Sequence, residues 1–425
     1  MNYSVKTLSN GLRVITVPMK DRDSASVAIW VKAGARYESA KLSGVSHFLE
    51  HMLFKGTKKR TTRQIKEEIE GVGGVLNAFT GEESTCYFAK LLVPHFPRAL
   101  EVLSDMVNHA TLLGPEMDKE RTVILEEIKM YKDLPSHHVH DLMGELLWPG
   151  EPLGRPISGT EKSVQDLART EVVAYKNRYY HPRNIIVSIS GSVDPEAVAE
   201  QVETYFPQKS ALPESKFEAA KSKQSKPRTC FVEKQTEQTH FVIGLRGLSR
   251  FHPDRYTLGL LNVILGGNMS SRLFEEVREK RGLAYEIRSG ASFYHDTGML
   301  SISAGVEKTK AAQAAHVVLR ELEKFRRAKV TEGELRRAKD YFMSQLYMAI
   351  EDTLEHLLWV GERVLDGGEP PNHDKIRKSI EAVTREDIQM TARRLFVNRG
   401  LNLALIGPIG EKVQNTIKKG FEISE

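Results

Sequence analysis

Two stretches of this chain share one residue pattern, and this internal repeat constrains the fold more than any other feature of the sequence. Residues 163–191 align with residues 379–407 without a gap, at a constant separation of 216 residues. Each copy predicts a capped amphipathic helix, a turn and an apolar strand that ends at a glycine. Identities are few, so the apolar pattern carries the match, and shared helix–strand periodicity without common ancestry is the alternative.

A duplication of this kind predicts two domains of one fold. A chain of 425 residues is too long for one ordinary core and suits two or three domains. Residues 209–228, between the two copies, are rich in Lys, Ser, Ala and Pro and lack an apolar period, as a linker does. We therefore expect domains at 1–208 and 229–425. Both mix strand-like stretches with long helices, which predicts the α+β class.

Composition and charge exclude several classes of function. Hydrophobic residues at 40% and charged residues at 28% are typical of a globular protein. A net charge of +5 is small against 61 basic and 56 acidic residues, so we expect neither nucleic acid nor an anionic membrane as a partner. Cys86 and Cys230 offer no disulfide framework and suit a reducing compartment. With no signal peptide and no apolar run of about 18 residues, a cytoplasmic location is expected.

A helical segment between Ser43 and Gly56 carries the sequence His-x-x-Glu-His. Positions i, i+3 and i+4 share one face of a helix, so His47, Glu50 and His51 converge while apolar residues cover the opposite side. Two imidazoles one turn apart are natural zinc ligands, and a carboxylate between them can serve as general base in this inverted zinc-peptidase motif. A helix with two surface histidines is the alternative.

Zinc needs a third protein ligand if one position is to stay open for water. The helix predicted from Gly114 offers several carboxylates, and helical periodicity distinguishes them. One face is predicted to hold Glu120, Val123, Ile124, Glu127 and Tyr131. Glu126 points away from that face, so Glu127 is the expected ligand. Glu120 is expected to support the catalytic site by orienting a ligand or the substrate. A buried salt bridge to Lys or Arg is the alternative for both.

These residues together resemble the pitrilysin (M16) family of metallopeptidases. The resemblance rests on the motif at 47–51, on Glu120, and on Glu127, which follows His51 by 76 residues. Residues 73–87 are similar to the substrate-binding edge strand and hairpin of the family, which implies that Asn77, Ala78 and Phe79 bind substrate. Residues 152–159 match the family as well. Arg278 and Tyr285 match its Arg-x6-Tyr substrate-contacting element, so the likeness spans essentially the whole chain.

The resemblance implies the shorter M16 arrangement, as in bacterial peptidases and the catalytic subunit of mitochondrial processing peptidase. The chain would contain two homologous domains, each a mostly antiparallel sheet covered by helices, and only the first domain would bind Zn²⁺, one ion per chain. Extended peptides would add a strand beside Asn77 and Ala78 and be hydrolysed with Glu50 as base. A homodimer that encloses the catalytic chamber is expected, in which Arg278 and Tyr285 of one copy complete the site of the other.

Other interpretations remain open from the sequence alone. A non-catalytic structural or partner subunit of an M16 hetero-oligomer is the main alternative to a peptidase, although the intact ligand set argues against it. Arg278 and Tyr285 could instead be a salt-bridging surface residue and a packing ring. His137, His138 and His140 form a cluster without acidic or Cys partners at helical spacing, so we expect a solvated helix end there.

Overall fold

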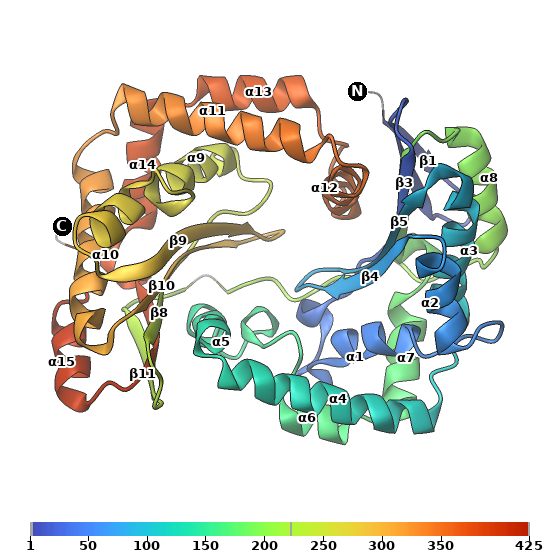
Figure 1. Cartoon of the computed structure of the whole chain (residues 1–425), viewed down its shortest axis with the longest axis horizontal. Coiled ribbons are helices and arrows are strands. Elements are labelled where there is room, and N and C mark those ends of the chain that lie inside the picture. Colours follow the sequence, from blue (N-terminus) through green and yellow to red (C-terminus); the bar gives the residue numbers. More distant parts are fainter. Residues whose placement is uncertain (1–2, 222, 424–425) are drawn as a thin grey trace. The chain divides into compact units, whose positions relative to one another are not determined.

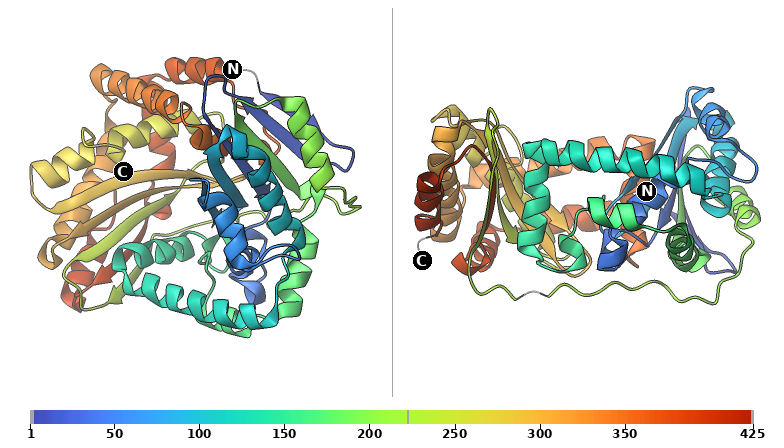
Figure 2. Two further views of the ribbon diagram at one scale, coloured as in Figure 1. Left: turned by 45° about the vertical axis from the view of Figure 1, so that its right-hand side comes forward. Right: turned by 90° about the horizontal axis from the view of Figure 1, so that it is seen from below.

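The computed structural model describes residues 3–221 and 223–423, which form two compact units (Figures 1 and 2). Unit 1 comprises the chain up to Ile128 together with Pro156–Glu218 and Leu346–His373. Unit 2 comprises Lys129–Arg155, Ala219–Gln345 and the chain from Asp374 onwards. Each unit holds one sheet covered by helices.

The sheet of unit 1 has six strands among the described residues. In chain order they are β1 (Ser4–Thr7), β2 (Arg13–Pro18), β3 (Ser24–Val31), β4 (Val75–Thr80), β5 (Thr85–Leu92) and β6 (Ile185–Gly191). Their order across the sheet is β1-β2-β6-β3-β5-β4. Strands β2 and β6 are parallel, and the other neighbouring pairs are antiparallel. Strand β4 therefore lies at one edge and pairs only with β5 (Figure 1).

The described part of unit 2 repeats this topology with five strands. They are β7 (Arg228–Glu233), β8 (Thr239–Arg246), β9 (Ala284–Phe293), β10 (Gly298–Val306) and β11 (Asn402–Gly407). The order β7-β11-β8-β10-β9 matches β2-β6-β3-β5-β4, with the parallel pair β7 and β11 at the same place. Helices α7 (Arg169–Tyr179) and α14 (Arg385–Leu395) lie 216 residues apart, as the repeat predicts. The α+β class with two similar, mostly antiparallel sheets is confirmed.

The remaining helices are divided between the units. Unit 1 contains α1 (Val45–Leu53), α2 (Thr62–Glu70), α3 (Phe96–His109), most of α4 (Gly114–Asp133), α6 (Glu161–Asp166), α8 (Pro195–Tyr205) and α12 (Thr353–Leu365). Unit 2 contains α5 (Pro135–Leu147), α9 (Arg255–Gly266), α10 (Ala311–Arg327), most of α11 (Glu332–Ala349) and α13 (His373–Ala382), and α15 (Glu411–Lys419).

The unit 1 sheet is buried on both faces. Side chains alternate along a strand, so Val27, Ile29 and Val31 of β3 enter one core cluster while Ala28 and Trp30 enter another. The first cluster includes residues of α1, α2 and α3, and the second includes residues of α12. Because helices cover both faces of the sheet, β3 carries apolar side chains on both of its sides.

Helix α5 covers the unit 2 sheet in the equivalent way. Val139, Met143 and Leu147 of α5 pack in one cluster with residues of β8 and β11. Gly244 of β8 allows this close approach, because a Cβ atom at that position would lie 2.3 Å from the Sδ atom of Met143. The glycine is therefore required by helix–sheet packing rather than by a turn.

The compact units are not the contiguous halves that the sequence suggests. Helix α5 belongs to the predicted domain 1–208 but packs in unit 2, and α12 belongs to 229–425 but packs in unit 1. The predicted linker 209–228 has no helix and no strand before β7 among its described residues, and the chain changes unit within it, after Glu218 (Figure 2). The boundaries 1–208 and 229–425 stay a prediction for the repeated halves.

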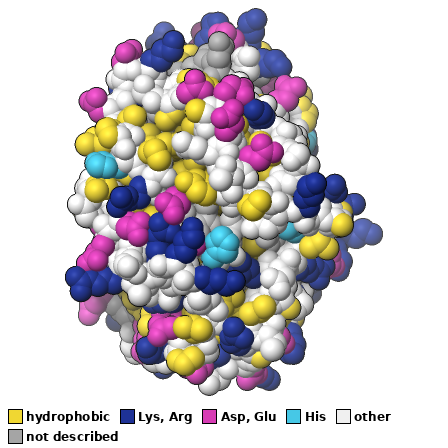
Figure 3. Space-filling view, turned by 90° about the vertical axis from the view of Figure 1, so that its right-hand side faces the viewer, with side chains coloured by type: hydrophobic (Ala, Val, Ile, Leu, Met, Phe, Trp, Pro, Cys, Tyr) yellow, Lys and Arg dark blue, Asp and Glu magenta, His cyan; other side chains and the backbone are white. Residues whose placement is uncertain are grey.

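The pattern of charged side chains on the surface agrees with the small net charge of the chain. Basic and acidic side chains are interspersed on the face drawn in Figure 3. Cys86 is buried, Cys230 is half-buried, and both are free thiols. Within the described ranges, no helix combines the length and the hydropathy needed to cross a membrane.

Candidate metal centre

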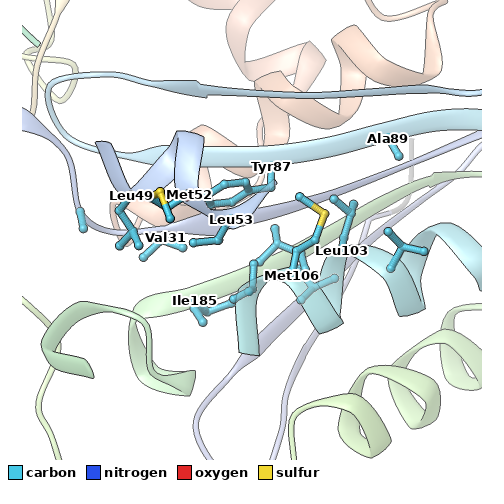
Figure 4. Close-up of a cluster of buried hydrophobic side chains, with 14 of the residues drawn as sticks. Val31, Leu49, Met52, Leu53, Tyr87, Ala89, Leu103, Met106 and Ile185 are labelled. Atoms are coloured by element: carbon cyan, nitrogen blue, oxygen red, sulfur yellow. The ribbon is translucent and has the colours of Figure 1, made fainter. Parts of the chain in front are cut away.

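Helix α1 presents the histidine motif because its other side is anchored in the core of unit 1. Leu49, Met52 and Leu53 are buried and pack beside Tyr87 and Met106 (Figure 4). This anchoring fixes the rotation of the helix about its axis. The polar side chains one turn apart are thereby held on the opposite side.

The start of α1 is stabilised by a buried carboxylate. Gly44, with φ of 91°, lies at the N-cap position, where a side chain would be strained. The Glu38 carboxylate accepts hydrogen bonds from the backbone N–H groups of Gly44 (2.7 Å) and Ser46 (2.8 Å). A negative charge at a helix N-terminus satisfies unpaired donors and opposes the helix dipole.

Helix α4 supplies the carboxylates. Its buried stripe contains Glu120, Ile124 and Ile128, while Glu126 is exposed and Glu127 is half-buried at the border of the stripe. The prediction that Val123 shares the inward face is wrong, because Val123 is 51% exposed. The inward face centres on Glu120 and Ile124, so Val123 lies just beyond it.

The ligand atoms of His47, His51 and Glu127 all lie within 4.8 Å of one another. Oε2 of Glu127 is 3.8 Å from Nε2 of His47 and 3.7 Å from Nε2 of His51. Tetrahedral zinc with bonds of 2.0–2.2 Å separates its ligands by about 3.4 Å, so small side-chain shifts would suffice. Two imidazoles and a carboxylate match the donor set of catalytic zinc sites, and the three residues therefore fit the metal.

The two imidazoles differ in their electrostatic surroundings. Burial, with the neighbouring His51, lowers the pKa of His47 to about 4, which keeps its ring neutral as a zinc ligand must be. Burial alone would lower the pKa of His51, but the hydrogen bond to Glu120 and the nearby carboxylates outweigh it and raise that pKa. The Nδ1–H of His51 donates to Oε1 of Glu120 at 2.8 Å, which leaves Nε2 to face Glu127.

Glu120 has a second partner that the sequence reasoning missed. Its other carboxylate oxygen forms an ion pair with the Nζ atom of Lys55. Burial alone would raise the pKa of Glu120, but the hydrogen bonds from His51 and Lys55 lower it below its ordinary value. Glu120 thus contacts the predicted ligand His51 and also makes a salt bridge to Lys55, and its role in orienting a ligand stays a prediction. Lys55 lies beyond the end of α1 at Leu53, so no helical spacing in the sequence indicated this contact.

Glu50, the expected base, lies between α1 and the edge strand β4. The hydroxyl of Thr80 donates to Oε2 of Glu50 at 2.5 Å. Burial raises the pKa of Glu50, and the hydrogen bond from Thr80 partly offsets that increase. Thr80 was not among the predicted site residues, although it follows Ala78 by two positions and so shares its face of the strand.

Three of the predicted substrate-binding residues, at positions 77–79, lie on β4, whose outer edge pairs with no strand of the described sheet. Asn77 is exposed and Ala78 is half-buried. Phe79 is 38% exposed, and its ring packs edge-to-face on Trp30 at a centroid distance of 5.6 Å. An unpaired edge of this kind can accept an extended peptide.

Family models match most of the chain. The model for insulinase (peptidase family M16) matches residues 13–161, and the model for the peptidase M16 inactive domain matches residues 166–342. The chain belongs to peptidase family M16. The first match contains all four residues of the predicted metal and base set, and the second contains none of them.

Relatives that are named as zinc proteases occur in several bacteria. The chain is 36% identical to a Bacillus subtilis protein named uncharacterized zinc protease YmxG, over 95% of this chain and 98% of the relative. It is 35% identical to a Streptomyces coelicolor protein named uncharacterized zinc protease SCO5738, over 96% and 90% of the two chains. The similarity to proteins named zinc proteases therefore extends over nearly the whole length of this chain.

Solved structures share the fold. A protease from Helicobacter pylori superimposes with a TM-score of 0.90 at 24% identity, covering 96% of this chain and 99% of that one. A peptidase M16 inactive domain from Pseudomonas fluorescens gives a TM-score of 0.88 at 19% identity, covering 96% and 98%. At these identities the likeness supports the fold alone.

The M16-like element Arg278 and Tyr285 is assembled within unit 2. Arg278 lies in the π-helical turn Phe274–Glu279, and Tyr285 lies near the start of β9. The guanidinium carbon of Arg278 is 5.0 Å from the centroid of the Tyr285 ring, which is 79% exposed. The structure thus brings these two residues together and leaves the phenol accessible, whereas the predicted metal ligands belong to unit 1.

The histidines of α5 do not join a metal group. His137 and His140 are exposed and His138 is half-buried, in line with the expected solvated helix end. In the part of the chain that the structure describes, His47, His51 and Glu127 are the one group of three such side chains close enough to hold a metal.

Proposed function

We propose that this chain is a zinc-dependent endopeptidase that hydrolyses extended or unfolded peptides. The observation that carries the proposal is the convergence of two imidazole nitrogens and the Glu127 carboxylate beside Glu50, next to an unpaired strand edge. When bound by this set, zinc supplies Lewis-acid activation of the scissile carbonyl and of the attacking water.

The residues of the chain then have distinct roles. Backbone groups of β4 near Asn77 and Ala78 hold the peptide in an extended form through hydrogen bonds that depend little on its sequence. Glu50 takes a proton from the attacking water as the oxygen of that water bonds to the carbonyl carbon. The same proton passes to the departing nitrogen as the C–N bond breaks, so the products are a carboxylic acid and an amine.

Glu50→Gln tests the proposal. The substitution removes the base without removing a metal ligand, so we expect unchanged zinc content and a loss of peptide cleavage of about 10²- to 10⁴-fold. Zinc is measured by metal analysis, and cleavage with a fluorogenic peptide with and without chelator. Glu126→Gln is the matched control, because Glu126 is exposed on α4. Cleavage by Glu50→Gln within tenfold of wild type would contradict the role of Glu50.

A wild-type chain that binds zinc but cleaves no peptide would favour the alternative, a non-catalytic M16 subunit. The presence of the complete set His47, Glu50, His51 and Glu127 argues against it, since a purely structural subunit has no need of a base beside a metal site.

We also infer that the active form is a C₂ homodimer in which Arg278 and Tyr285 of one copy complete the site of the other. The exposed phenol of Tyr285, with Arg278 stacked against it, supports this inference because such a pair can hydrogen-bond a substrate or a developing oxyanion.

Mixing two inactive variants tests the shared site. A Glu50→Gln chain and an Arg278→Ala/Tyr285→Phe chain should each be inactive alone, yet a mixed dimer would recover one site with every wild-type group. We therefore expect activity to return on mixing. Differently tagged chains that co-purify would verify subunit exchange, and continued inactivity of such a mixture would refute the shared site.

A further inference from the structure

Strand β4 contacts the predicted base through its last residue. Side chains alternate along the strand, and Leu76 and Ala78 pack against the core cluster that contains residues of α1. Phe79 points to the other face, where it packs on Trp30. Thr80 shares the face of Ala78, and its hydroxyl reaches Glu50.

This hydrogen bond occupies one oxygen of the Glu50 carboxylate and leaves the other available. Oε2 accepts from Thr80 at 2.5 Å, whereas Oε1 has no hydrogen-bond partner among residues 3–221 and 223–423. A free glutamate side chain samples several rotamers, and fixing it costs conformational entropy. A hydroxyl fixed on a strand holds the carboxylate in one orientation before the substrate arrives, which is preorganisation of the base.

We propose that Thr80 is a positioning residue that orients Glu50 and couples the peptide-binding strand to the base. This inference rests on the proposed peptidase function. The backbone of Thr80 belongs to the strand that would pair with the peptide, and its side chain holds the group that would take the proton. A peptide bound along β4 is thereby placed in fixed register with Oε1 of Glu50.

Two substitutions separate the hydroxyl from the shape of the side chain. Thr80→Val removes the hydroxyl and keeps the β-branched shape that suits a strand, whereas Thr80→Ser keeps the hydroxyl. Hydrogen bonds to charged groups are among the stronger ones in proteins, so we expect Thr80→Val to lower kcat by about 10- to 100-fold with little change in KM. Thr80→Ser should restore kcat to within a few-fold of wild type.

Thr57→Val is the matched control. Its hydroxyl also donates to a carboxylate, Oδ2 of Asp105, at 2.6 Å, but the pair lies outside the predicted site. This variant should lose thermal stability while its kcat stays near the wild-type value. Zinc content, measured for every variant, should stay unchanged.

Peptide binding gives a readout that does not depend on catalysis. In the Glu50→Gln background, addition of Thr80→Val should leave the Kd for a labelled peptide unchanged and should lower the residual rate by much less than tenfold, because the two substitutions act on one group. A weaker Kd, an unchanged kcat in Thr80→Val, or no rescue by Thr80→Ser would overturn the positioning role. Absence of wild-type cleavage would instead refute the proposed function itself.

Discussion

Replacing Glu120 tests how strongly a residue that contacts a predicted zinc ligand affects the zinc affinity of the site. Glu120 is 5% exposed, so water cannot easily replace its carboxylate. Oε1 accepts the Nδ1–H of His51 at 2.8 Å, and Oε2 pairs with Lys55. Partners of this kind fix the imidazole tautomer, and their loss typically costs about 10- to 100-fold in metal affinity, or about 1.4–2.7 kcal/mol.

Two substitutions of Glu120 should give losses of zinc affinity at the two ends of that range. Glu120→Gln retains a carbonyl oxygen that can accept from His51 but loses the charge, so we expect zinc affinity to fall by about 10-fold. Glu120→Leu leaves the Nδ1–H of His51 without an acceptor, so we expect about 100-fold. Lys55 is 27% exposed and can turn to water, so its lost ion pair should add little.

Competition with a fluorescent zinc chelator at constant pH measures the affinity without reference to activity. Glu116→Gln is the control, because Glu116 lies on the same helix and pairs with the exposed Lys119 at 2.7 Å. It should bind zinc as the wild type does. Affinity of Glu120→Leu within threefold of wild type, or an equal loss in Glu116→Gln, would refute the role of Glu120.

Three further predictions concern separate parts of the chain. Glu127→Gln should weaken zinc binding in the same competition assay while Glu126→Gln should not, because only Glu127 reaches both imidazoles; equal affinities would contradict the ligand assignment. Gly361→Ala should lower stability in urea by about 1–3 kcal/mol, because the new Cβ atom would lie 2.2 Å from Nε1 of Trp30, and an unchanged midpoint would contradict the packing of α12. Burial lowers the pKa of His356 to about 4, so the unfolded chain takes up its proton first as pH falls below about 6.5, and stability should fall towards pH 4. Between neutral pH and pH 5, the free energy of unfolding should fall by roughly 1–2 kcal/mol more in wild type than in His356→Asn, both measured in chelator. Equal losses in the two proteins would contradict this role of His356.

Part of the site follows from local spacing alone. His47, Glu50 and His51 share a helix face because of their positions at i, i+3 and i+4, and the structure places the ring nitrogens of the two histidines near Glu127. The same periodicity distinguishes Glu127 from Glu126. A helix of regular pitch fixes the angle between any two of its side chains, so these relations need no knowledge of the rest of the chain.

The contacts that complete the site could not be read in this way. The contact of Thr80 with Glu50 joins residues 30 positions apart, and that of Lys55 with Glu120 joins residues 65 positions apart. The first contact depends on which strand lies beside α1. The second depends on where α4 passes the end of α1. The predicted burial of Val123 was wrong for the same reason, since periodicity gives the faces of a helix but not the width of the surface that covers them.

The repeat and the histidine motif thus determined the fold class and the face that carries the predicted ligands. Only the tertiary structure decided that α5 and α12 each cover the sheet of the other half. The physical reason is that an amphipathic helix carries an apolar stripe that can pack on either of two similar sheets. The choice depends on features distant in sequence, such as the room that Gly244 gives to Met143 and Gly361 gives beside Trp30.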